Sequence, residues 1–436
     1  MNRPKLHFTP SKGWINDPNG LLWDGERYHL FAQHNPDDVV WGTMHWLHAV
    51  SSDMLHWKEI GIALAPDVLG TMFSGSAARL SDGKIALMYT AHGDMQRQCV
   101  AFSEDGVHFE KSPENPVIEN PGLKDFRDPK LFRNRVYGCW SAILAAGDHI
   151  RFYRSEDLIH WSMTGTFASK RMGYIFECPD LFFLKTPEGR EMAVMTCSMI
   201  CTPEEKGCRM QYFIGEFDGD TFREIDPPSE PLRPDAGYDS YAGVTYSGTD
   251  ETVWMHWMTA TSHPMPVKDY CGCISLPRKL SLSRAKNGLR LSQKCVLPEC
   301  AWHTLLADGT LPDAPFALRL TVNNAFELAF RDENQQDAFR IWLDSDGNIC
   351  TERATSPDFV LGSAYNDDAR RKTVVPRQSD GEMELLVVVD AYCTEIFADN
   401  GFYAHSLLTF PNGGFRSVKA SEGTQIQGAI INLSRI

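Results

Sequence analysis

Apolar residues in this chain fall into short runs of strand length, and turn residues separate these runs. Residues 85–90 and 192–196 are examples, and Asp-Gly or other Gly-rich turns divide the runs from one another. A short apolar run between turn signals is typical of a buried β-strand. Long amphipathic helical patterns do not occur in the sequence. The pattern therefore predicts an all-β fold.

A polar turn followed by an aromatic residue recurs in the first half of the chain. A small or acidic residue, an Asp and a closing aromatic occur at residues 52–57, 103–109 and 155–161, and more loosely at 218–222. The aromatics stand at positions 57, 109, 161 and 222, so successive copies are 52, 52 and 61 residues apart. A repeat of about 50 residues that holds about four short strands is typical of a β-propeller blade. The repeats predict five blades, and coincidental hairpins in another all-β fold are the alternative.

The pattern changes after Pro298. Every second residue from 316 to 322 is apolar, as in strands with one buried face. Similar strand patterns, separated by turn signals, occur at residues 339–343, 385–389 and 394–397. Short strands in this part of the chain favour a β-sandwich. We therefore expect a propeller over residues 1–298, a short linker over 299–305 and a sandwich over 306–436.

Composition narrows the class of partner. Hydrophobic residues make up 43% and charged residues 23% of the 436 residues, the balance of a soluble globular protein. Asp and Glu outnumber Lys and Arg by 57 to 42, which gives a formal charge of −15. An acidic surface repels phosphate backbones, so no nucleic-acid partner is expected. The 11 Trp residues fit a sugar-binding protein, and they also fit a large core.

The sequence favours a cytoplasmic chain without a cofactor. Its first residues contain no apolar stretch that resembles a signal peptide, and its apolar runs are far shorter than the roughly 20 residues of a membrane helix. The 12 Cys are scattered, and Cys271 and Cys273 lack the CxxC spacing of a zinc site, so free thiols are expected. No HExxH, Gly-rich phosphate loop or GxSxG motif occurs, which excludes the common metalloprotease, nucleotide-binding and serine-hydrolase classes. No metal, organic cofactor or membrane partner is expected.

Three motifs each place a carboxylate close to a Pro. They are Trp-Ile-Asn-Asp-Pro-Asn-Gly around Asp17, Phe-Arg-Asp-Pro-Lys around Asp128 and Glu-Cys-Pro-Asp-Leu, which begins at Glu177. The carboxylates are 111 and 49 residues apart, close to two blades and then one, so they can converge on the propeller axis. Each motif alone could serve a turn or a surface ion pair. Three carboxylates in one pocket oppose each other's ionisation, which can keep one protonated while another is ionised.

These motifs resemble the three signature blocks of glycoside hydrolase family 32, the invertases and fructan β-fructosidases. Other stretches that look like family blocks follow in order along nearly the whole chain: residues 31–36, 41–42, 73–76, 235–242, 276–280 and 389–397. The resemblance implies a five-bladed propeller joined to a β-sandwich, which agrees with the fold that the repeats predict.

The resemblance also implies a role for each carboxylate in a retaining double displacement. It implies that Asp17 is the nucleophile that attacks C2 of a terminal fructosyl unit. It implies that Glu177 is the general acid and then the base, and that Asp128, held by Arg127, stabilises the transition state. An ionised carboxylate near C2 suits this chemistry, because the oxocarbenium ion of a ketoside forms readily.

Further residues match or approximate family positions that line the fructose pocket. Together with Arg127, the predicted substrate-binding residues are Asn16, Gln33, Trp41, Phe73, Ser74, Asp239, Tyr241 and Trp257. The sequence departs from the family at His34, where Tyr is frequent, at Ser240, where Phe is usual, and at His256, where Gly is common. These departures concern the pocket wall, so they leave the leaving-group preference open.

The resulting functional hypothesis is an invertase-type β-fructofuranosidase. It would hydrolyse terminal, non-reducing β-D-fructofuranosyl bonds in sucrose or short fructo-oligosaccharides. Sucrose-6-phosphate hydrolysis and fructosyl transfer use the same carboxylates and stay open as alternatives. A non-catalytic sugar-binding propeller and an arabinanase-like enzyme are more remote. The sandwich could pack on the propeller or form a homo-oligomer interface.

Overall fold

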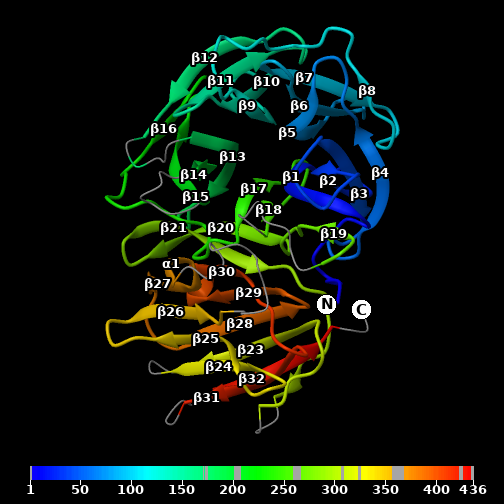
Figure 1. Ribbon diagram of the computed structural model, residues 1–436. Helices are drawn as coiled ribbons and strands as arrows, with labels where there is room; N and C mark the ends of the chain where they lie inside the picture. Colours follow the sequence, from blue (N-terminus) through cyan, green and yellow to red (C-terminus); the bar gives the residue numbers. More distant parts are fainter. Residues whose placement is uncertain are drawn as a thin grey trace.

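The computed structural model describes the chain in nine stretches, and the elements named below lie within them. These are residues 2–169, 171, 175–200, 208–258, 267–305, 309–322, 326–355, 368–421 and 426–433. Figure 1 shows two β modules: a ring of sheets drawn in blue to light green, and a pair of stacked sheets drawn in yellow to red. No helix in the described part of the chain is long and apolar enough to cross a membrane.

The ring consists of five sheets, and each blade has four antiparallel strands that lie close together in sequence. The first sheet holds β1 (Gly13–Trp23), β2 (Tyr28–Asn35), β3 (His45–Ser51) and β4 (Lys58–Leu64). The second holds β5 (Thr71–Arg79), β6 (Ile85–His92), β7 (Gln96–Ser103) and β8 (Glu110–Lys111). The third holds β9 (Arg127–Arg133), β10 (Trp140–Ala145), β11 (Ile150–Ser155) and β12 (Ser162–Phe167).

The remaining two blades complete the ring. The fourth holds β13 (Ile175–Lys185), β14 (Glu191–Ile200), β15 (Cys208–Phe217) and β16 (Phe222–Glu224). The fifth holds β17 (Tyr241–Thr245), β18 (Val253–Trp257), β20 (Arg278–Ala285) and β21 (Gly288–Cys295). The short strand β19 (Tyr270–Cys271) leaves the fifth blade and pairs in parallel with β1, at Gly13 and Trp14. This pairing joins the last blade to the first.

The polar repeat of the sequence forms the same turn in three blades. In the first blade, the Asp53 carboxylate accepts hydrogen bonds from the backbone N–H groups of Leu55 and His56, and it also contacts the Ser51 hydroxyl and the His56 ring. Asp105 and Asp157 make the equivalent bonds in the second and third blades. The turn therefore links the third and fourth strands of each of these blades by local hydrogen bonds.

The closing aromatics of the repeat pack against neighbouring elements. Phe109 of the second blade meets Phe31 of the first edge to face, with ring centroids 5.5 Å apart. Phe222 of the fourth blade meets Phe167 of the third at 5.1 Å. These contacts bury apolar surface between adjacent sheets.

The second module consists of two stacked sheets around one apolar core. One sheet is ordered β22 (His303–Thr304), β32 (Ile426–Asn432), β23 (Phe316–Val322), β28 (Met383–Asp390), β29 (Cys393–Ala398) and β30 (Tyr403–Leu408). The other is ordered β27 (Lys372–Pro376), β26 (Asn348–Arg353), β25 (Asp337–Leu343), β24 (Glu327–Asp332) and β31 (Phe415–Ala420). Two short helical turns, α1 (Asp368–Arg371) and η2 (Asp399–Gly401), accompany them.

The structure confirms the predicted all-β fold, with a five-bladed propeller followed by a β-sandwich. The alternating run of residues 316–322 is strand β23, whose Phe316, Leu318 and Leu320 are fully buried. The propeller strands end at Cys295, and β22 lies within the stretch 299–305 that was expected to be a linker, where it pairs with β32. Residue 306, the expected start of the sandwich, lies outside the described residues.

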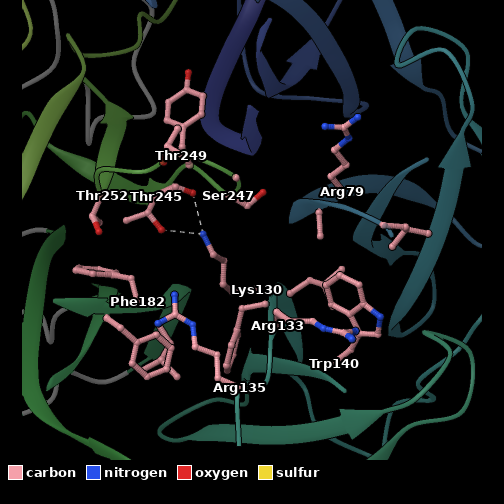
Figure 2. Close-up of a pocket in the computed structure, with 18 of the residues that line it drawn as sticks. Arg79, Lys130, Arg133, Arg135, Trp140, Phe182, Thr245, Ser247, Thr249 and Thr252 are labelled. Carbon is pink, nitrogen blue, oxygen red and sulfur yellow. Dashed lines mark hydrogen bonds between the residues drawn. The ribbon is translucent and has the colours of Figure 1, made fainter. Parts of the chain in front are cut away.

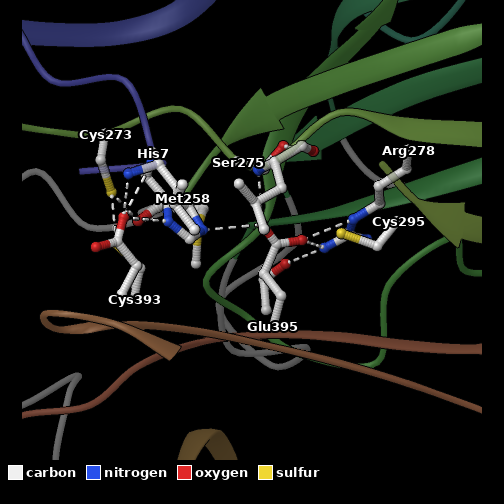
Figure 3. A network of polar contacts seen from close by, with 12 residues as sticks. His7, Met258, Cys273, Ser275, Arg278, Cys295, Cys393 and Glu395 are labelled. Atoms are coloured by element: carbon white, nitrogen blue, oxygen red, sulfur yellow. Dashed lines mark hydrogen bonds and ion pairs between the residues drawn. The ribbon is translucent and has the colours of Figure 1, made fainter. Parts of the chain in front are cut away.

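A buried network of charged groups joins the two modules (Figure 3). Arg278 of β20 forms ion pairs with Glu395 of β29 at 2.6 Å and with Asp235 at 3.0 Å. His7 lies between two sandwich carboxylates, 3.1 Å from Asp390 and 3.0 Å from Glu395. Burial alone would lower the pKa of His7, but its two carboxylate partners outweigh that effect and raise it to about 10. The sandwich is therefore attached to the propeller by paired charges as well as by apolar contacts.

Candidate active site

The five inner strands of the propeller share a break in their pairing at the same end. Strands β1, β5, β9, β13 and β17 contact one another around the axis, and each has a register shift against its neighbour in the blade. The extra residues are Asn16 and Asp17, Ser74, Asp128 and Pro129, Cys178 and Pro179, and Ala242 and Gly243. A β-bulge redirects the side chains beside it, so five bulges around one axis can turn polar groups inward.

Positive φ angles mark three of these bulges. Asp128, Cys178 and Ala242 have φ angles of 61°, 44° and 53°. Non-glycine residues seldom adopt this left-handed region, and such strain is found more often at functional sites than elsewhere. A Pro follows Asp128 and another follows Cys178. Neither has an N–H to donate to the sheet, which suits a bulge.

Asp17 lies on β1 and is surrounded by hydrogen-bond donors. Its Oδ2 accepts from Gln33 Nε2 at 3.0 Å, from the Ser74 hydroxyl at 2.7 Å and from the Cys178 thiol at 3.5 Å. Burial raises the pKa of Asp17, the charge of Glu177 raises it further, and the bond from Ser74 opposes the rise. Donors on one oxygen stabilise the ionised carboxylate that a nucleophile requires.

Asp128 lies on β9 and faces the same thiol. Its Oδ2 accepts from the backbone N–H of Cys178 at 2.8 Å and lies 3.7 Å from the Cys178 sulfur. Burial raises the pKa of Asp128 to about 7, against the opposing effect of Arg127 and with added repulsion from Glu177 and Asp17. The three carboxylates therefore share one electrostatic environment, as the motif spacing predicts.

Glu177 lies on β13 and is held at both oxygens. Arg127 Nη2 donates to Oε1 at 3.0 Å, and the Tyr241 hydroxyl donates to Oε2. Arg127 is itself oriented by Asp125 at 2.6 Å and by Gln96 at 3.2 Å. Burial raises the pKa of Tyr241 well above its usual value, so its phenol stays protonated and donates. Elements from three blades thus fix the orientation of this carboxylate.

Aromatic residues surround the carboxylates. Trp14 packs edge to face on Trp257, with centroids 5.8 Å apart, and its indole N–H donates to Asn16 Oδ1 at 2.8 Å. Trp41 meets Phe73 edge to face at 6.1 Å and leaves 52% of its surface exposed. Trp14, Cys178, Tyr241 and Trp257 belong to one buried cluster, and Phe73 packs against it. An exposed indole beside a polar pocket is a suitable stacking surface for a sugar ring.

Asp239 is placed differently from the other predicted residues. Its Oδ2 accepts from the guanidinium of Arg353 on β26 and, at 2.9 Å, from the backbone N–H of Leu408 on β30. Both partners belong to the sandwich. Asp239 therefore anchors the segment that leads to Tyr241, and through Tyr241 it is connected to Glu177.

Within the described residues, no group of three or more His, Cys, Asp or Glu side chains is arranged to hold a metal ion. The arrangement can supply a nucleophile from Asp17 and proton transfer from Glu177.

A model of the family described as "Glycosyl hydrolases family 32 N-terminal domain" matches residues 7–295, well over half of the chain. The chain belongs to glycoside hydrolase family 32. The matched region extends from the segment before β1 to the end of β21 and so covers all five blades.

Known relatives extend the family 32 match into the sandwich. The chain is 32% identical to a levanase from Bacillus subtilis, over 98% of this chain and 68% of the relative. It is 30% identical to a sucrose-6-phosphate hydrolase from Escherichia coli, over 97% of this chain and 93% of the relative. An exo-inulinase structure from Aspergillus awamori superposes with a TM-score of 0.86 at 26% identity, over 98% and 97% of the two chains.

Some residues of this family 32 site were not predicted from the sequence. Cys178 follows Glu177 in the third carboxylate motif, and the contact of its thiol with Asp17 and Asp128 was not predicted. Burial and the neighbouring carboxylates raise the pKa of Cys178 well above its usual value, so the thiol stays protonated and acts as a weak donor. His92, which stacks on Phe73 at 4.2 Å, had not been predicted either. Its only sequence signal is its place at the end of a buried strand.

Proposed function

We propose that this family 32 protein hydrolyses terminal, non-reducing β-D-fructofuranosyl bonds in sucrose and short fructo-oligosaccharides, with retention of configuration. The observation that carries the proposal is the convergence of Asp17, Asp128 and Glu177 from three inner strands on one cluster, with Cys178 in contact with both aspartates. The relatives support the class of substrate, because their names describe enzymes of levan, sucrose 6-phosphate and inulin.

The first step of the proposed mechanism forms a covalent intermediate. A carboxylate oxygen of Asp17 attacks C2 of the fructosyl unit while the C2–O bond to the leaving group breaks. Glu177 gives its proton to the departing oxygen, so a neutral alcohol leaves and Glu177 becomes a carboxylate. Arg127 and Tyr241, which hold the two oxygens of Glu177, orient it for this transfer.

The second step releases the fructose. Glu177 takes a proton from water, the water oxygen bonds to C2, and the bond between C2 and Asp17 breaks. Two inversions at C2 give net retention. Asp128, whose Oδ2 is held by the Cys178 N–H, would accept hydrogen bonds from sugar hydroxyls and strengthen them as positive charge develops at C2.

Sucrose-6-phosphate hydrolysis is a second candidate, since the Escherichia coli relative of that name aligns over 93% of its own length. The carboxylates would serve either substrate, because they act at the fructosyl carbon. The choice depends on the groups that meet the leaving sugar. Fructosyl transfer differs from both in the acceptor that attacks in the second step.

A substrate panel tests these alternatives. Turnover over Michaelis constant is measured for sucrose, 1-kestose, inulin, levan and sucrose 6-phosphate, with glucose and fructose quantified separately. Equal release of glucose and fructose from sucrose supports hydrolysis, and a large shortfall of free fructose would indicate transfer. A preference for sucrose 6-phosphate of about tenfold or more over sucrose would favour the second candidate.

Two substitutions test the carboxylates directly. Asp17→Asn and Glu177→Gln are each expected to lower kcat by about a thousandfold or more, because each removes a group that acts in the transition state. Asp148→Asn and Glu191→Gln, which change exposed carboxylates in the same way, are matched controls. Near-normal turnover in Asp17→Asn or Glu177→Gln would remove that residue from its proposed role.

A further inference from the structure

Two cysteines from different modules touch within the buried interface between the propeller and the sandwich (Figure 3). Cys273 lies two residues after β19 in the propeller, and Cys393 is the first residue of β29 in the sandwich. Their sulfur atoms are 3.4 Å apart, and both residues are fully buried. We call these two residues the interface cysteines. They are 120 positions apart in the sequence, so the contact depends on how the two modules dock.

The chain segments beside this contact are held close together. The Tyr392 hydroxyl donates to the Tyr270 hydroxyl at 3.1 Å, so a second contact between the modules lies next to the sulfurs in sequence. Gly272, which precedes the propeller cysteine, has a φ angle of 94° and leaves no room for a Cβ against the Ile15 carbonyl of β1. The interface cysteines therefore belong to a closely packed region, where the sulfurs have little freedom to separate.

The distance between the two sulfurs is short enough for a disulfide to form with little rearrangement. A disulfide bond is about 2.05 Å long, so the sulfurs have to approach each other by about 1.4 Å. Rotation of the two side chains about their Cα–Cβ bonds can share this movement. Packing of two thiols as small apolar groups, without any reaction between them, is the alternative.

The closed interface protects these thiols from rapid oxidation. Burial raises the pKa of Cys393 well above its usual value, and the contact with Cys273 and the charges of Asp390 and Glu395 raise it further. Because the thiolate is the reactive form, a buried and protonated thiol reacts slowly. Oxidation is therefore expected to become faster when the contact between the modules loosens.

We propose that Cys273 and Cys393 form a disulfide between the propeller and the sandwich when the protein meets a peroxide oxidant. The bond would join the segment that follows β19, the strand that pairs with β1, to the first residue of β29. It would hold the two modules together at any pH, unlike the charge network around His7. The proposal is independent of the proposed hydrolase activity, because it uses none of the carboxylates of the active site.

Hydrogen peroxide supplies the oxidation in two steps. One thiol takes an oxygen atom from peroxide and becomes a sulfenic acid, and one water leaves. The sulfur of the second thiol then bonds to the first sulfur, its proton joins the departing hydroxyl group, and a second water leaves. The two sulfurs together lose two electrons, and the two peroxide oxygens gain them. With the second thiol 3.4 Å away, the disulfide is expected to form before a second peroxide can give a sulfinic acid.

Peptide mapping of the full chain tests the proposal. The reduced protein is incubated with hydrogen peroxide, in buffer alone and in urea below the unfolding transition, and the remaining thiols are alkylated. Trypsin releases Cys273 in the peptide 269–278 and Cys393 in the peptide 378–416. Mass spectrometry is expected to detect these two peptides linked to each other, with faster linkage in urea and separation by dithiothreitol.

The unfolding temperature gives a second measurement. The oxidised protein should unfold about 5 °C or more above the reduced protein, because the new bond closes a loop that spans 120 positions and so restricts the unfolded chain. Dithiothreitol should reverse the shift.

Variants identify the two sulfurs. Cys273→Ser and Cys393→Ser are each expected to abolish the linked peptides and the rise in unfolding temperature. Cys271→Ser is the matched control, because Cys271 is also buried and lies on the same tryptic peptide. Cys139→Ser is a second control in the third blade, where Cys139 precedes Trp140, a residue that lines a cavity at the ends of the inner strands (Figure 2). Both controls should keep the linked peptides and the temperature shift.

Three results would overturn the proposal. The first is the absence of the linked peptides from the unaltered chain in both buffer and urea. The second is linkage that persists in Cys273→Ser, which would make Cys271 the partner. The third is an equal rise in unfolding temperature on oxidation of Cys393→Ser, which would assign the rise to other thiols. The first result needs no variant, so it holds even where a substitution prevents folding.

Discussion

Asp128 illustrates how a buried carboxylate of the proposed site can lower the stability of the fold. Its pKa is about 7 in the folded chain because it is buried beside Glu177 and Asp17, whereas an exposed Asp has a pKa near 3.9. Between pH 4 and pH 7 the folded state therefore binds more protons than the unfolded state. Stability falls as pH rises through this window.

Asp128→Asn should remove this loss of stability, because Asn carries no charge at any pH in this range. The variant is expected to unfold at a temperature about 2 °C or more above the parent at pH 8, with a difference that shrinks toward pH 4. Scanning calorimetry from pH 4 to pH 8 provides the measurement. A variant that is less stable than the parent at pH 8 would contradict the assignment of the raised pKa to Asp128.

Ser74 is expected to orient Asp17, the proposed nucleophile, and to lower the pKa of its carboxyl group. Its hydroxyl donates to Asp17 and lowers the pKa of that carboxyl, so Ser74→Ala should raise the pKa. Because the proposed nucleophile must be ionised, the acid limb of kcat/KM should move to higher pH. Ser76→Ala is the control, since Ser76 lies on the same strand but donates to the Pro129 carbonyl. A limb that moves equally in both variants would argue against a specific effect on Asp17.

At the residue scale, the sequence predicted the positions of the three carboxylates better than the contacts that hold the site residues in place. Asp17, Asp128 and Glu177 stand in motifs with Pro, and these motifs recur at blade spacing, so local sequence was informative. Cys178 was not predicted to contact two aspartates, because that contact depends on how three separate strands meet at the axis. The sandwich partners of Asp239 could not be predicted for the same reason: Arg353 and Leu408 are distant in sequence.

Among the elements, the polar turn of the first three blades is the clearest local unit. The Asp53 carboxylate accepts two backbone N–H bonds, and these bonds outweigh partial burial and lower its pKa to about 2. A group with a lowered pKa stabilises the fold above its unfolded value of about 3.9, and this contribution is lost as pH falls toward 2.

Asp53→Ala is therefore expected to cost about 1 kcal/mol of unfolding free energy at pH 7 and little at pH 2.5. The estimate is modest because the side chain of Asp53 is 43% exposed and water screens its interactions. Urea unfolding at both pH values measures the difference. Asp148→Ala, at an 86% exposed side chain, should have a much smaller effect at either pH.

The elements also show the limit of sequence patterns. The turn was recognisable because its donors and acceptors lie within four residues of one another. The bulges of the inner strands were not predicted, since a bulge is a mismatch in length between two paired strands and depends on their register. Bulges nevertheless carry the residues of the proposed site.

On the scale of the whole molecule, the two modules were predicted and their interface was not. Repeats and alternation reveal a propeller and a sandwich separately. The charge network around Arg278 and Glu395 joins residues that are more than a hundred positions apart, and no local pattern marks them as partners. The predicted oligomeric role of the sandwich stays a prediction.

His7 gives this interface a measurable pH dependence. Its pKa is about 10 in the folded chain and near 6.5 in the unfolded chain. The contribution of His7 to the unfolding free energy is therefore complete below pH 6.5 and is lost as pH rises through 10. His7→Gln is expected to lower the unfolding free energy by about 3 kcal/mol at pH 6, because the buried Asp390 loses its cation and the buried Glu395 keeps only Arg278. The difference should narrow toward pH 10. His108→Gln, at an exposed histidine paired with Asp105, is the control.

The parallel pairing of β19 with β1 has a consequence for the order in which the protein is made. The strand that carries Asp17 is synthesised first, but its parallel partner at Tyr270 and Cys271 emerges only with the fifth blade. A nascent chain that ends before this point already contains Asp17, Asp128 and Glu177, but the ring that brings them together is not yet closed. If these carboxylates act as proposed, a nascent chain would become active only after the fifth blade has docked.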